Sequence, residues 1–208
     1  MSSTYEISRL GYLERRDAPL GSGILKSAEM TIALAVPDIL IARAKSGDEE
    51  ALAALYRAFE TPVYNLARRM LRNVEDAEDV LQETFLEVVK SIRNYRGEGH
   101  LWGWIRQIAA SKALMRIRRS QVRAEEAFDE EVTGSSPPVG VPAQIDLERA
   151  FEHLSETARA VVWLHDVEGY THEEISEMMG KSVSFSKSQL ARAHNRLRRV
   201  LGGQGVTQ

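Results

Sequence analysis

The chain has 208 residues, of which 43% are hydrophobic and 27% charged, and its formal net charge is -3 at pH 7. This length suits one domain or two small ones. The absence of cysteine excludes disulfides, thiolate metal sites and a thiol nucleophile. No apolar run approaches the roughly twenty residues that cross a bilayer, and the first residues lack the charged-then-apolar order of a secretory signal. We therefore expect a cytoplasmic protein with no membrane span.

Acidic and basic residues are separated along the chain rather than mixed. Residues 74–89 carry six acids and no base, whereas residues 90–123 carry nine bases and a single acid, Glu98. Residues 125–131 are acidic again, and residues 181–199 carry bases but no acid. Local charge decides contacts at physiological salt, because the Debye length is only about 8 Å. The sequence therefore predicts two separate basic surfaces despite the near-neutral total.

Helical signals begin at Asp38, so residues 1–37 are interpreted as an N-terminal extension of unknown function. Asp48 is predicted to cap the next helix. Pro62 should break or restart that helix, because proline lacks the N–H group that a residue in the helix interior donates.

The clearest helical pattern covers residues 75–92. One face carries an apolar stripe, and the acids and Gln82 occupy the other face. The stripe comprises Ala77, Val80, Leu81, Thr84, Phe85, Val88, Val89 and Ile92. A glycine-containing turn is expected over 94–99, and the next helix over 101–119.

The predicted fold class is all-α, with two helical domains joined by a flexible linker. The first domain covers residues 38–120. Residues 121–143 mix acids, glycine, serine and proline, a composition that buries little surface and indicates the linker. Helical patterns resume near Ile145, so the second domain is placed at 144–202, followed by a tail at 203–208.

The second domain ends in a predicted helix-turn-helix. Ser155 is expected to cap a helix that ends near Asp166, and residues 171–174 fit the capping box that opens the next helix. Gly180 should end this helix, and Ser182 or Ser184 should cap the last one, which extends to about Leu201. The predicted inner face of the last helix comprises Val183, Leu190, Ala193, Leu197 and Leu201.

The outer face of this last helix has the composition that a recognition helix needs. Such a helix enters the major groove with polar side chains for base edges and cations for phosphates. Groove contacts are predicted from Ser184, Phe185, Lys187, Ser188, Gln189 and Arg192. Phosphate contacts are predicted from Arg196, Arg198 and Arg199. A terminal helix with a merely solvated basic face is the structural alternative.

The first basic surface combines cations with aromatic side chains. Tyr95, Trp102 and Trp104 lie among arginines and lysines, and this combination suits unpaired bases that stack on aromatic rings. Tryptophans in helices often pack in the core. Because Trp102 and Trp104 point in different directions on a helix, we expect one in the core and the other near the surface.

Two stretches carry a family resemblance. DAEDVLQETFLEVVKSIRNYRGEGHLWGWIRQIA and LSETARAVVWLHDVEGYTHEEISEMMGKSVSFSKSQLARAHNRLRRVL resemble the region-two and region-four domains of bacterial extracytoplasmic-function sigma factors, in the same order and spacing. The resemblance covers about residues 38–201. It implies a sigma factor that binds core RNA polymerase and directs promoter-specific initiation by recognising minus-thirty-five and minus-ten elements.

The resemblance also assigns roles to residues. The clamp helices of the largest polymerase subunit would bind Asp76, Glu78, Asp79, Gln82, Glu83 and Phe85. Single-stranded minus-ten DNA would bind Asn94, Tyr95, Arg96, Trp102, Arg106, Ser111, Lys112, Arg116 and Arg119. Duplex minus-thirty-five DNA would bind Thr171, Ser184, Phe185, Lys187, Ser188, Gln189, Arg192 and Arg196. The polymerase flap region and an anti-sigma factor are further implied partners.

Part of the acidic segment has a simpler explanation. Acids near a helix N-terminus complement the helix dipole, but Glu83 and Glu87 lie well past the first turn. The chain also departs from the family pattern. Family members commonly carry asparagine at Ser111, aspartate near Met115, valine at Ser186 and arginine at Gln189. These differences bear on the promoter sequence, and the serine at position 186 is expected to loosen the packing of the recognition helix.

Other motifs are rejected. Gly180-Lys181-Ser182 imitates the end of a phosphate-binding loop, but it lacks the first glycine and follows a helix. Ser184 and Lys187 imitate a serine acylase motif without its companion motifs. No defensible metal-ligand spacing relates the five histidines, which are His100, His153, His165, His172 and His194. We therefore predict no catalytic residue, no metal and no cofactor, and a protein that is not an enzyme.

Two other functions would account for part of this pattern. A stand-alone helix-turn-helix regulator would bind duplex operator DNA, with residues 38–120 as a dimerisation or sensory bundle. Such a regulator has no need of the first basic surface with its aromatic side chains. An adaptor that binds only proteins would leave both basic surfaces unexplained. The sigma-factor hypothesis places the protein in the cytoplasm, associated with the nucleoid when it is part of the holoenzyme.

Overall fold

The computed structural model describes residues 36–97, 100–126 and 147–202. All regular elements in these three ranges are helical, so the predicted all-α fold class is confirmed. Among the helices of these ranges, none is long and apolar enough to cross a membrane. The predicted tail, most of the N-terminal extension and most of the predicted linker lie outside the described residues.

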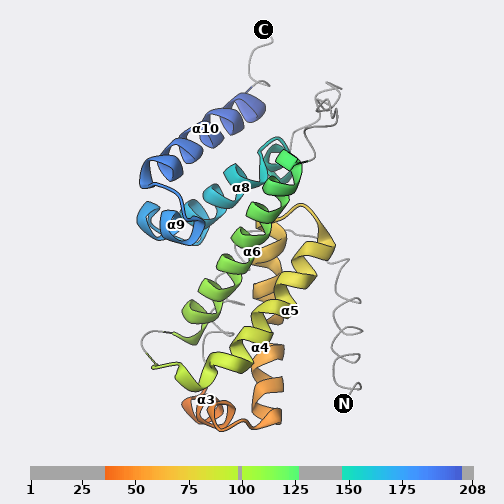
Figure 1. The fold of residues 1–208 in the computed structure, drawn as a ribbon, viewed down its shortest axis with the longest axis vertical. Helices are drawn as coiled ribbons and strands as arrows, with labels where there is room; N and C mark the ends of the chain where they lie inside the picture. Colours follow the sequence, from red (N-terminus) through yellow and green to blue (C-terminus); the bar gives the residue numbers. More distant parts are fainter. Residues whose placement is uncertain (1–35, 98–99, 127–146, 203–208) are drawn as a thin grey trace. The chain divides into compact units, whose positions relative to one another are not determined.

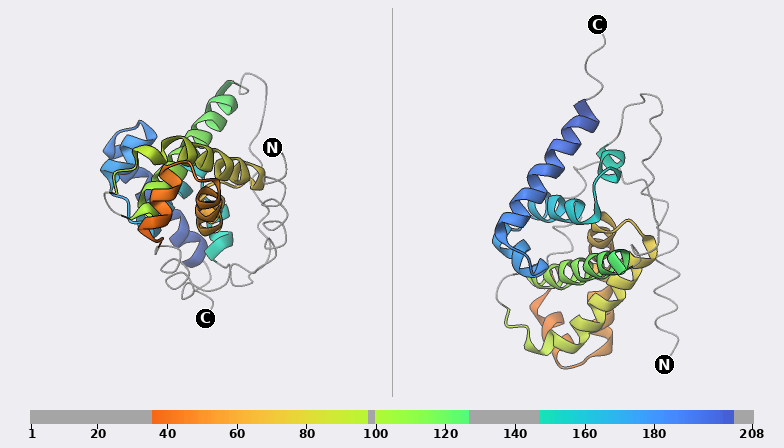
Figure 2. Two further views of the ribbon diagram at one scale, coloured as in Figure 1. Left: turned by 90° about the horizontal axis from the view of Figure 1, so that it is seen from below. Right: turned by 45° about the horizontal axis from the view of Figure 1, so that its top comes forward.

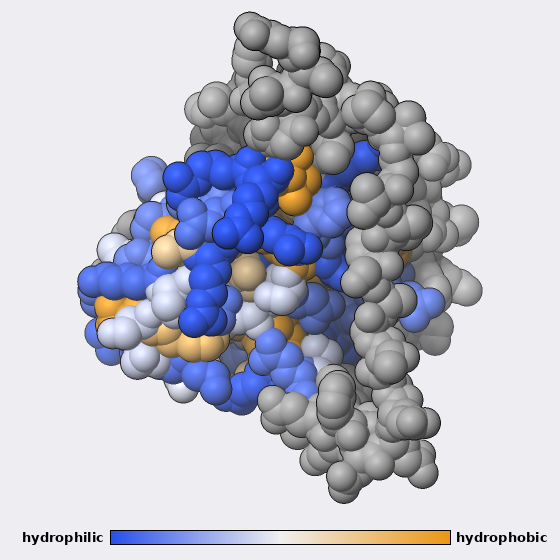
Figure 3. All heavy atoms as spheres, turned by 90° about the horizontal axis from the view of Figure 1, so that it is seen from above, coloured by the Kyte–Doolittle hydropathy of each residue, from blue (hydrophilic) through white to orange (hydrophobic). Residues whose placement is uncertain are grey.

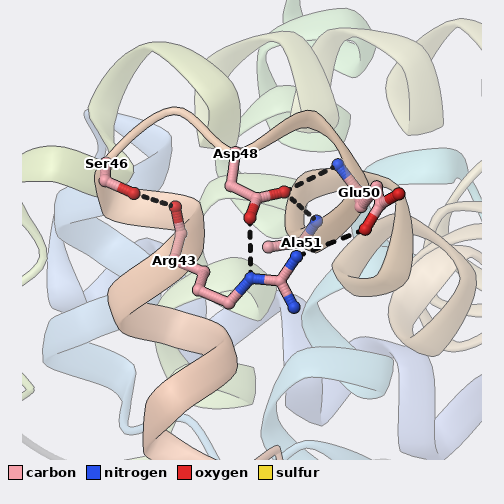
Figure 4. A network of polar contacts seen from close by, with 5 residues as sticks. All are labelled: Arg43, Ser46, Asp48, Glu50 and Ala51. Atoms are coloured by element: carbon pink, nitrogen blue, oxygen red, sulfur yellow. Dashed lines mark hydrogen bonds and ion pairs between the residues drawn. The ribbon is translucent and has the colours of Figure 1, made fainter.

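A polar turn joins the first two helices. Helix α3 covers Asp38–Lys45, and helix α4 covers Glu49–Met70. As predicted, Asp48 caps α4, because its Oδ1 accepts two backbone N–H bonds in the first turn, at 3.0 and 3.1 Å. Its other carboxylate oxygen lies 2.6 Å from Nε of Arg43 (Figure 4). The side chain of Asp48 thus ties the end of α3 to the start of α4.

Pro62 does not interrupt α4, so the prediction of a helix break is wrong. The helix continues through this residue to Met70. Proline removes one backbone hydrogen bond from a helix interior. However, Phe59 and Val63 on either side are 0% exposed. Burial of this face against neighbouring helices outweighs the local cost of the proline.

Three helices build the first core. Helix α5 covers Val74–Ser91, the short 3-10 helix η1 covers Ile92–Asn94, and α6 covers Leu101–Glu126. Helices α4, α5 and α6 all contact one another (Figure 1). The side chains that are 0% exposed between them include Leu55, Phe59, Val80, Ile105 and Ala109.

The apolar stripe predicted on α5 is buried except at one position. Val89 is 49% exposed, and its neighbour Leu86 is 47% exposed. Successive helical residues point about 100° apart, because a turn takes 3.6 residues. Val88 faces the core with 1% exposure, so Val89 turns away from it.

The second group contains four helices and one π-helical turn. Its elements are α7 (Leu147–Glu152), α8 (Glu156–Val162), the turn η3 (Trp163–Val167), α9 (His172–Met179) and α10 (Val183–Gly202). Helix α10 contacts α7, α8 and α9 (Figure 2). The predicted cap at Ser155 and the capping box of Thr171 with Glu174 are confirmed. Of the two serines proposed to cap α10, Ser182 does so.

Helix α6 is longer than the sequence predicted. The linker was expected from residue 121, but the helix continues to Glu126. The side-chain amide of Gln121 donates a hydrogen bond to the hydroxyl of Thr157 in α8. This contact joins residues far apart in the sequence, so no local pattern indicated it.

The two groups of helices contact each other, through α4 with α8 and through α6 with both α8 and α9. The guanidinium of Arg72 donates to backbone carbonyls at the end of α7 and beyond it, and its bond to the Leu154 carbonyl measures 2.6 Å. Nε of Arg159 donates to the backbone carbonyl of Arg69 at 2.7 Å. These arginines therefore satisfy carbonyl groups of the opposite group of helices.

Candidate polymerase and nucleic-acid interface

Acidic side chains predicted to bind polymerase form a row along the outer face of α5. Asp76, Asp79 and Glu83 are spaced three and four residues apart, so they share one face of the helix. Their side chains are 38%, 52% and 41% exposed. Gln82 beside them is also exposed. This row, called the acidic row below, presents negative charge to solvent.

Arg116 of α6 lies against the acidic row. Its Nε is 2.9 Å from Oδ1 of Asp76, its Nη2 is 2.8 Å from Oδ2 of Asp79, and its Nη1 is 3.8 Å from Oε1 of Glu83. Nζ of Lys112, which lies one turn earlier in α6, is 3.7 Å from a carboxylate oxygen of the next acid along α5. Both cations belong to the predicted minus-ten set. In this structure Arg116 pairs with three acids predicted to bind polymerase, and Lys112 pairs with a neighbouring acid of the same helix.

Exposed apolar side chains extend the acidic row, but the predicted polymerase-binding residue Phe85 is not among them. Phe85 is only 7% exposed, and its ring centroid lies 4.7 Å from that of Tyr56 in α4. The exposed apolar surface is formed instead by Leu86 and Val89. Sequence reasoning missed Leu86, because a leucine beside an apolar stripe gives no signal that separates surface from core.

The two tryptophans differ as predicted, one in the core and one nearer the surface. Trp102 is 7% exposed, and its ring stacks on Phe59 with centroids 5.9 Å apart and an interplanar angle of 7°. Trp104 is half-buried, and its ring centroid lies 5.2 Å from that of Tyr95. Tyr95 is itself 8% exposed. The rings of Trp102 and Tyr95 therefore serve as packing in this structure. The exposed members of the predicted minus-ten set are Asn94, Arg96 and Arg119.

Arg106, another predicted minus-ten residue, is held by the segment between η3 and α9. Its Nη1 donates to the backbone carbonyl of Glu168 at 2.8 Å and lies 3.3 Å from the Glu168 carboxylate. Its guanidinium carbon lies 4.6 Å from the ring centroid of Tyr170, and burial raises the pKa of the Tyr170 phenol. A role of Arg106 in DNA binding therefore requires release of these contacts. Ser111, from the same set, is half-buried.

Helices α9 and α10 have the geometry of a helix-turn-helix. Gly180 ends α9 with φ of 61°, a left-handed conformation that glycine adopts without steric cost. The inner face of α10 is formed by buried Ser186, Leu190, Ala193 and Leu197. Leu201 was predicted on this face, but it is 41% exposed. The structure adds Ser186 to the inner face.

The residues of α10 predicted to bind minus-thirty-five DNA lie away from its buried face. Ser184, Lys187, Arg192 and Arg196 are exposed, whereas Phe185, Ser188 and Gln189 are half-buried. Nζ of Lys181 lies 5.9 Å from the ring centroid of Phe185. In the view of Figure 3, hydrophilic residues cover most of the described surface, with small apolar spots between them. The outer face of α10 thus carries cations on a polar surface.

Thr171, also predicted to contact DNA, has a structural role at the start of α9. Its hydroxyl accepts the Glu174 N–H at 3.2 Å, and the Glu174 carboxylate accepts the Thr171 N–H at 2.8 Å. We expect Thr171→Ala to lower the free energy of unfolding by about 0.5 to 2 kcal/mol, measured by urea denaturation. Thr171→Ser keeps the hydroxyl and should stay near the native value; an equal loss in both variants would contradict the capping role.

Two family models match the chain, one in each group of helices. Residues 55–123 match sigma-70 region 2, and residues 144–197 match sigma-70 region 4. The first match contains α5 and most of α6, and the second contains α7, α8, α9 and most of α10. They define the class as a sigma factor of RNA polymerase.

Comparisons with individual proteins narrow this class. The chain is 34% identical over 167 residues to the ECF RNA polymerase sigma factor SigE of Mycolicibacterium smegmatis, covering 75% of this chain and 65% of that protein. It is 30% identical over 166 residues to the RNA polymerase sigma factor CarQ of Myxococcus xanthus, covering 77% and 94%. The chain belongs to the extracytoplasmic-function sigma factors, as the resemblance in its sequence indicated.

A solved structure supports the fold. The sigma factor RpoE of Bartonella quintana, crystallised with the anti-sigma factor NepR, matches with a TM-score of 0.50 at 20% identity. The match covers 77% of this chain and 99% of that one.

Proposed function

We propose that this chain binds core RNA polymerase through the acidic row of α5 and directs it to promoters through the outer face of α10. The observation that carries the proposal is the presence of both surfaces on one chain. An exposed acidic row suits a basic helical partner, and complementary charge favours fast and specific association. The cations and polar side chains of α10 suit phosphates and base edges of duplex DNA. The matches to regions 2 and 4 together favour this function over the operator-binding regulator.

We assign capture of unpaired minus-ten bases to the segment from Asn94 to Arg119. Within this segment, Trp104 replaces Trp102 as the aromatic residue that we expect to stack on a base. A ring that stacks on a base needs an open face. Trp102 is covered by the core, whereas Trp104 is half-buried. Trp104 is therefore the better candidate for stacking, and Arg96 and Arg119 are exposed cations for the backbone.

The protein supplies binding and positioning in this proposal, and the polymerase performs the bond chemistry. It would act in the cytoplasm and, within the holoenzyme, on the nucleoid. An anti-sigma factor is included as a partner on the ground of family membership.

The test combines polymerase retention with transcription. Core polymerase would be mixed with the native chain or with Asp79→Arg/Glu83→Arg, and run-off transcription would be measured on a library of random promoters. We expect the native chain to select a shared bipartite motif. The double variant should lose polymerase affinity by about tenfold or more, because each reversal replaces an attraction by a repulsion. Glu49→Arg, an exposed acid in the first turn of α4, is the matched control and should retain polymerase.

One result would overturn the proposal. If the native chain binds duplex DNA tightly by itself and never retains core polymerase, the operator-binding regulator becomes the better description. If the Asp79→Arg/Glu83→Arg double variant binds polymerase like the native chain, the acidic row is not the polymerase surface.

A further inference from the structure

A part-buried polar contact joins α10 to α9. Ser186 lies on the inner face of α10 and is 0% exposed. Its Oγ is 2.9 Å from Nδ1 of His172, the first residue of α9. The serine was expected to loosen the packing of the recognition helix. The structure instead gives it a specific partner, so the two helices are joined by a hydrogen bond at this point.

The contact belongs to a larger histidine network. The ring of His165, in the turn η3, stacks on His172 with centroids 4.5 Å apart and an interplanar angle of 24°. Nδ1 of His165 lies 2.8 Å from Oδ1 of Asp166, and Oδ2 of Asp166 lies 2.6 Å from Nε2 of His194 in α10. The network therefore reaches α10 twice, at Ser186 and at His194. Eight residues separate these points, or about 12 Å of helix.

Neither a metal site nor ordinary core packing explains this arrangement. Over the part of the chain that the structure describes, no group of three or more His, Asp or Glu side chains is placed to hold a metal ion. The side chains of His165, Asp166 and His194 are 34%, 34% and 43% exposed. The network is thus open to protons from solvent, and its contact with Ser186 is part-buried.

We propose that neutral His172 positions the recognition helix through Ser186, and that binding of minus-thirty-five DNA weakens as His172 gains a proton. In the neutral ring with its proton on Nε2, Nδ1 accepts the Ser186 O–H bond. A proton on Nδ1 turns this nitrogen into a donor to Ser186 Oγ and places a positive charge against the buried face of α10. The inference rests on the proposed function, since it assumes that α10 reads the DNA.

The charges around His172 set the direction of the effect. Burial lowers the pKa of His172 from 6.5, and the neighbouring cations of His165 and Lys187 lower it further. Glu173 of α9 and Asp166 of η3 oppose the shift. The docked arrangement therefore binds fewer protons than an undocked one, so docking weakens as the pH falls below about 6.5.

Titration of Asp166 does not contribute to changes in this pH range. Burial raises the pKa of Asp166, but hydrogen bonds with His165 and His194 outweigh burial and leave the pKa below 3.8. Because its pKa is lowered, its contribution to stability is lost only in far stronger acid. Changes in DNA binding between about pH 7.5 and 5.5 therefore report on protonation of histidine side chains.

The test measures DNA discrimination by the holoenzyme over this window. Fluorescence anisotropy would compare a duplex carrying the selected minus-thirty-five sequence with a scrambled duplex at constant ionic strength. We expect the discrimination of the native chain to fall between about pH 7.5 and 5.5, because His172 gains a proton at the lower pH. His172→Asn, whose amide can still reach Ser186 without titrating, should show a clearly smaller change in discrimination than the native chain over the same window. His153→Asn removes a histidine outside the network and should behave like the native chain.

A second measurement separates this inference from the proposed function. Amide hydrogen exchange of α10 in the free full-length chain, corrected for intrinsic rates, should be faster at about pH 5.5 in the native chain but not in His172→Asn. If the holoenzyme discriminates no sequence at any pH, the proposed function fails, and the exchange experiment still decides the role of His172. Equal pH profiles for the native chain and His172→Asn in either assay would overturn the inference.

Discussion

Replacing Phe59 with alanine is expected to lower the free energy of unfolding by about 3 to 5 kcal/mol. Phe59 is 0% exposed, and its ring lies parallel to that of Trp102, with an interplanar angle of 7°. The two residues belong to α4 and α6, so the lost ring leaves a gap between two helices that contact α5 as well. Such a gap closes poorly, because moving one helix disturbs its packing on the others. Urea denaturation followed by circular dichroism would measure the loss.

Leu86→Ala provides the matched control. Leu86 is 47% exposed on α5, so its truncation should change the free energy of unfolding by about 0.5 kcal/mol or less. It should nevertheless weaken polymerase binding if the apolar surface beside the acidic row takes part in that contact. A loss for Phe59→Ala no larger than for Leu86→Ala would contradict the assignment of Phe59 to the core.

The helix starts were predicted well because their signals are local. Asp48, Ser155 and Thr171 each accept hydrogen bonds from backbone N–H groups two or three residues later in the chain. A short window of sequence contains everything that such a cap needs. The apolar stripes of α5 and α10 were likewise visible from helical spacing, apart from Val89 on α5 and the two ends of the α10 stripe, where Val183 is half-buried and Leu201 is exposed.

The errors concern residues whose environment comes from distant parts of the chain. Pro62 stays inside α4 because neighbouring helices bury that helix, and Gln121 stays helical where α8 offers it a partner. Ser186 appeared to be a packing defect, because His172 lies fourteen residues away. Sequence spacing does not reveal which side chain will meet a buried hydroxyl group.

The candidate site was predicted in composition but not in pairing. The acidic row was evident from charge and spacing. Its contact with Arg116 was not, because Asp79 and Arg116 are 37 residues apart. The contact of Arg106 with Glu168 spans 62 residues. Several cations assigned to minus-ten DNA therefore have protein partners that only the fold reveals.

Arg116→Glu is expected to lower the free energy of unfolding by about 2 to 4 kcal/mol, and Arg116→Ala by about 1 to 2 kcal/mol. Exposed ion pairs contribute about 0.2 to 1 kcal/mol each, and Arg116, with 23% exposure, is within 4.0 Å of three acids. The partners are 38% to 52% exposed, which limits the loss on truncation to alanine. Glutamate adds like-charge repulsion with the acidic row, hence the larger effect. Urea denaturation at low and high salt would measure both variants, and about 1 M salt should shrink the difference because the Debye length falls to about 3 Å.

Two comparisons decide whether Arg116 supports the acidic row or binds DNA. Arg118→Ala removes an exposed arginine from the same helix and should leave stability within about 0.5 kcal/mol of the native value. In a double-mutant cycle, Arg116→Ala and Asp79→Ala should couple by about 0.5 kcal/mol or more, since the two side chains touch. A purely DNA-binding Arg116 predicts the opposite pattern, with unchanged stability, no coupling and a defect confined to promoter opening. With the coupling, the acidic row is held in place by α6, and the helix that we propose to face DNA also orients the surface that we propose to face polymerase.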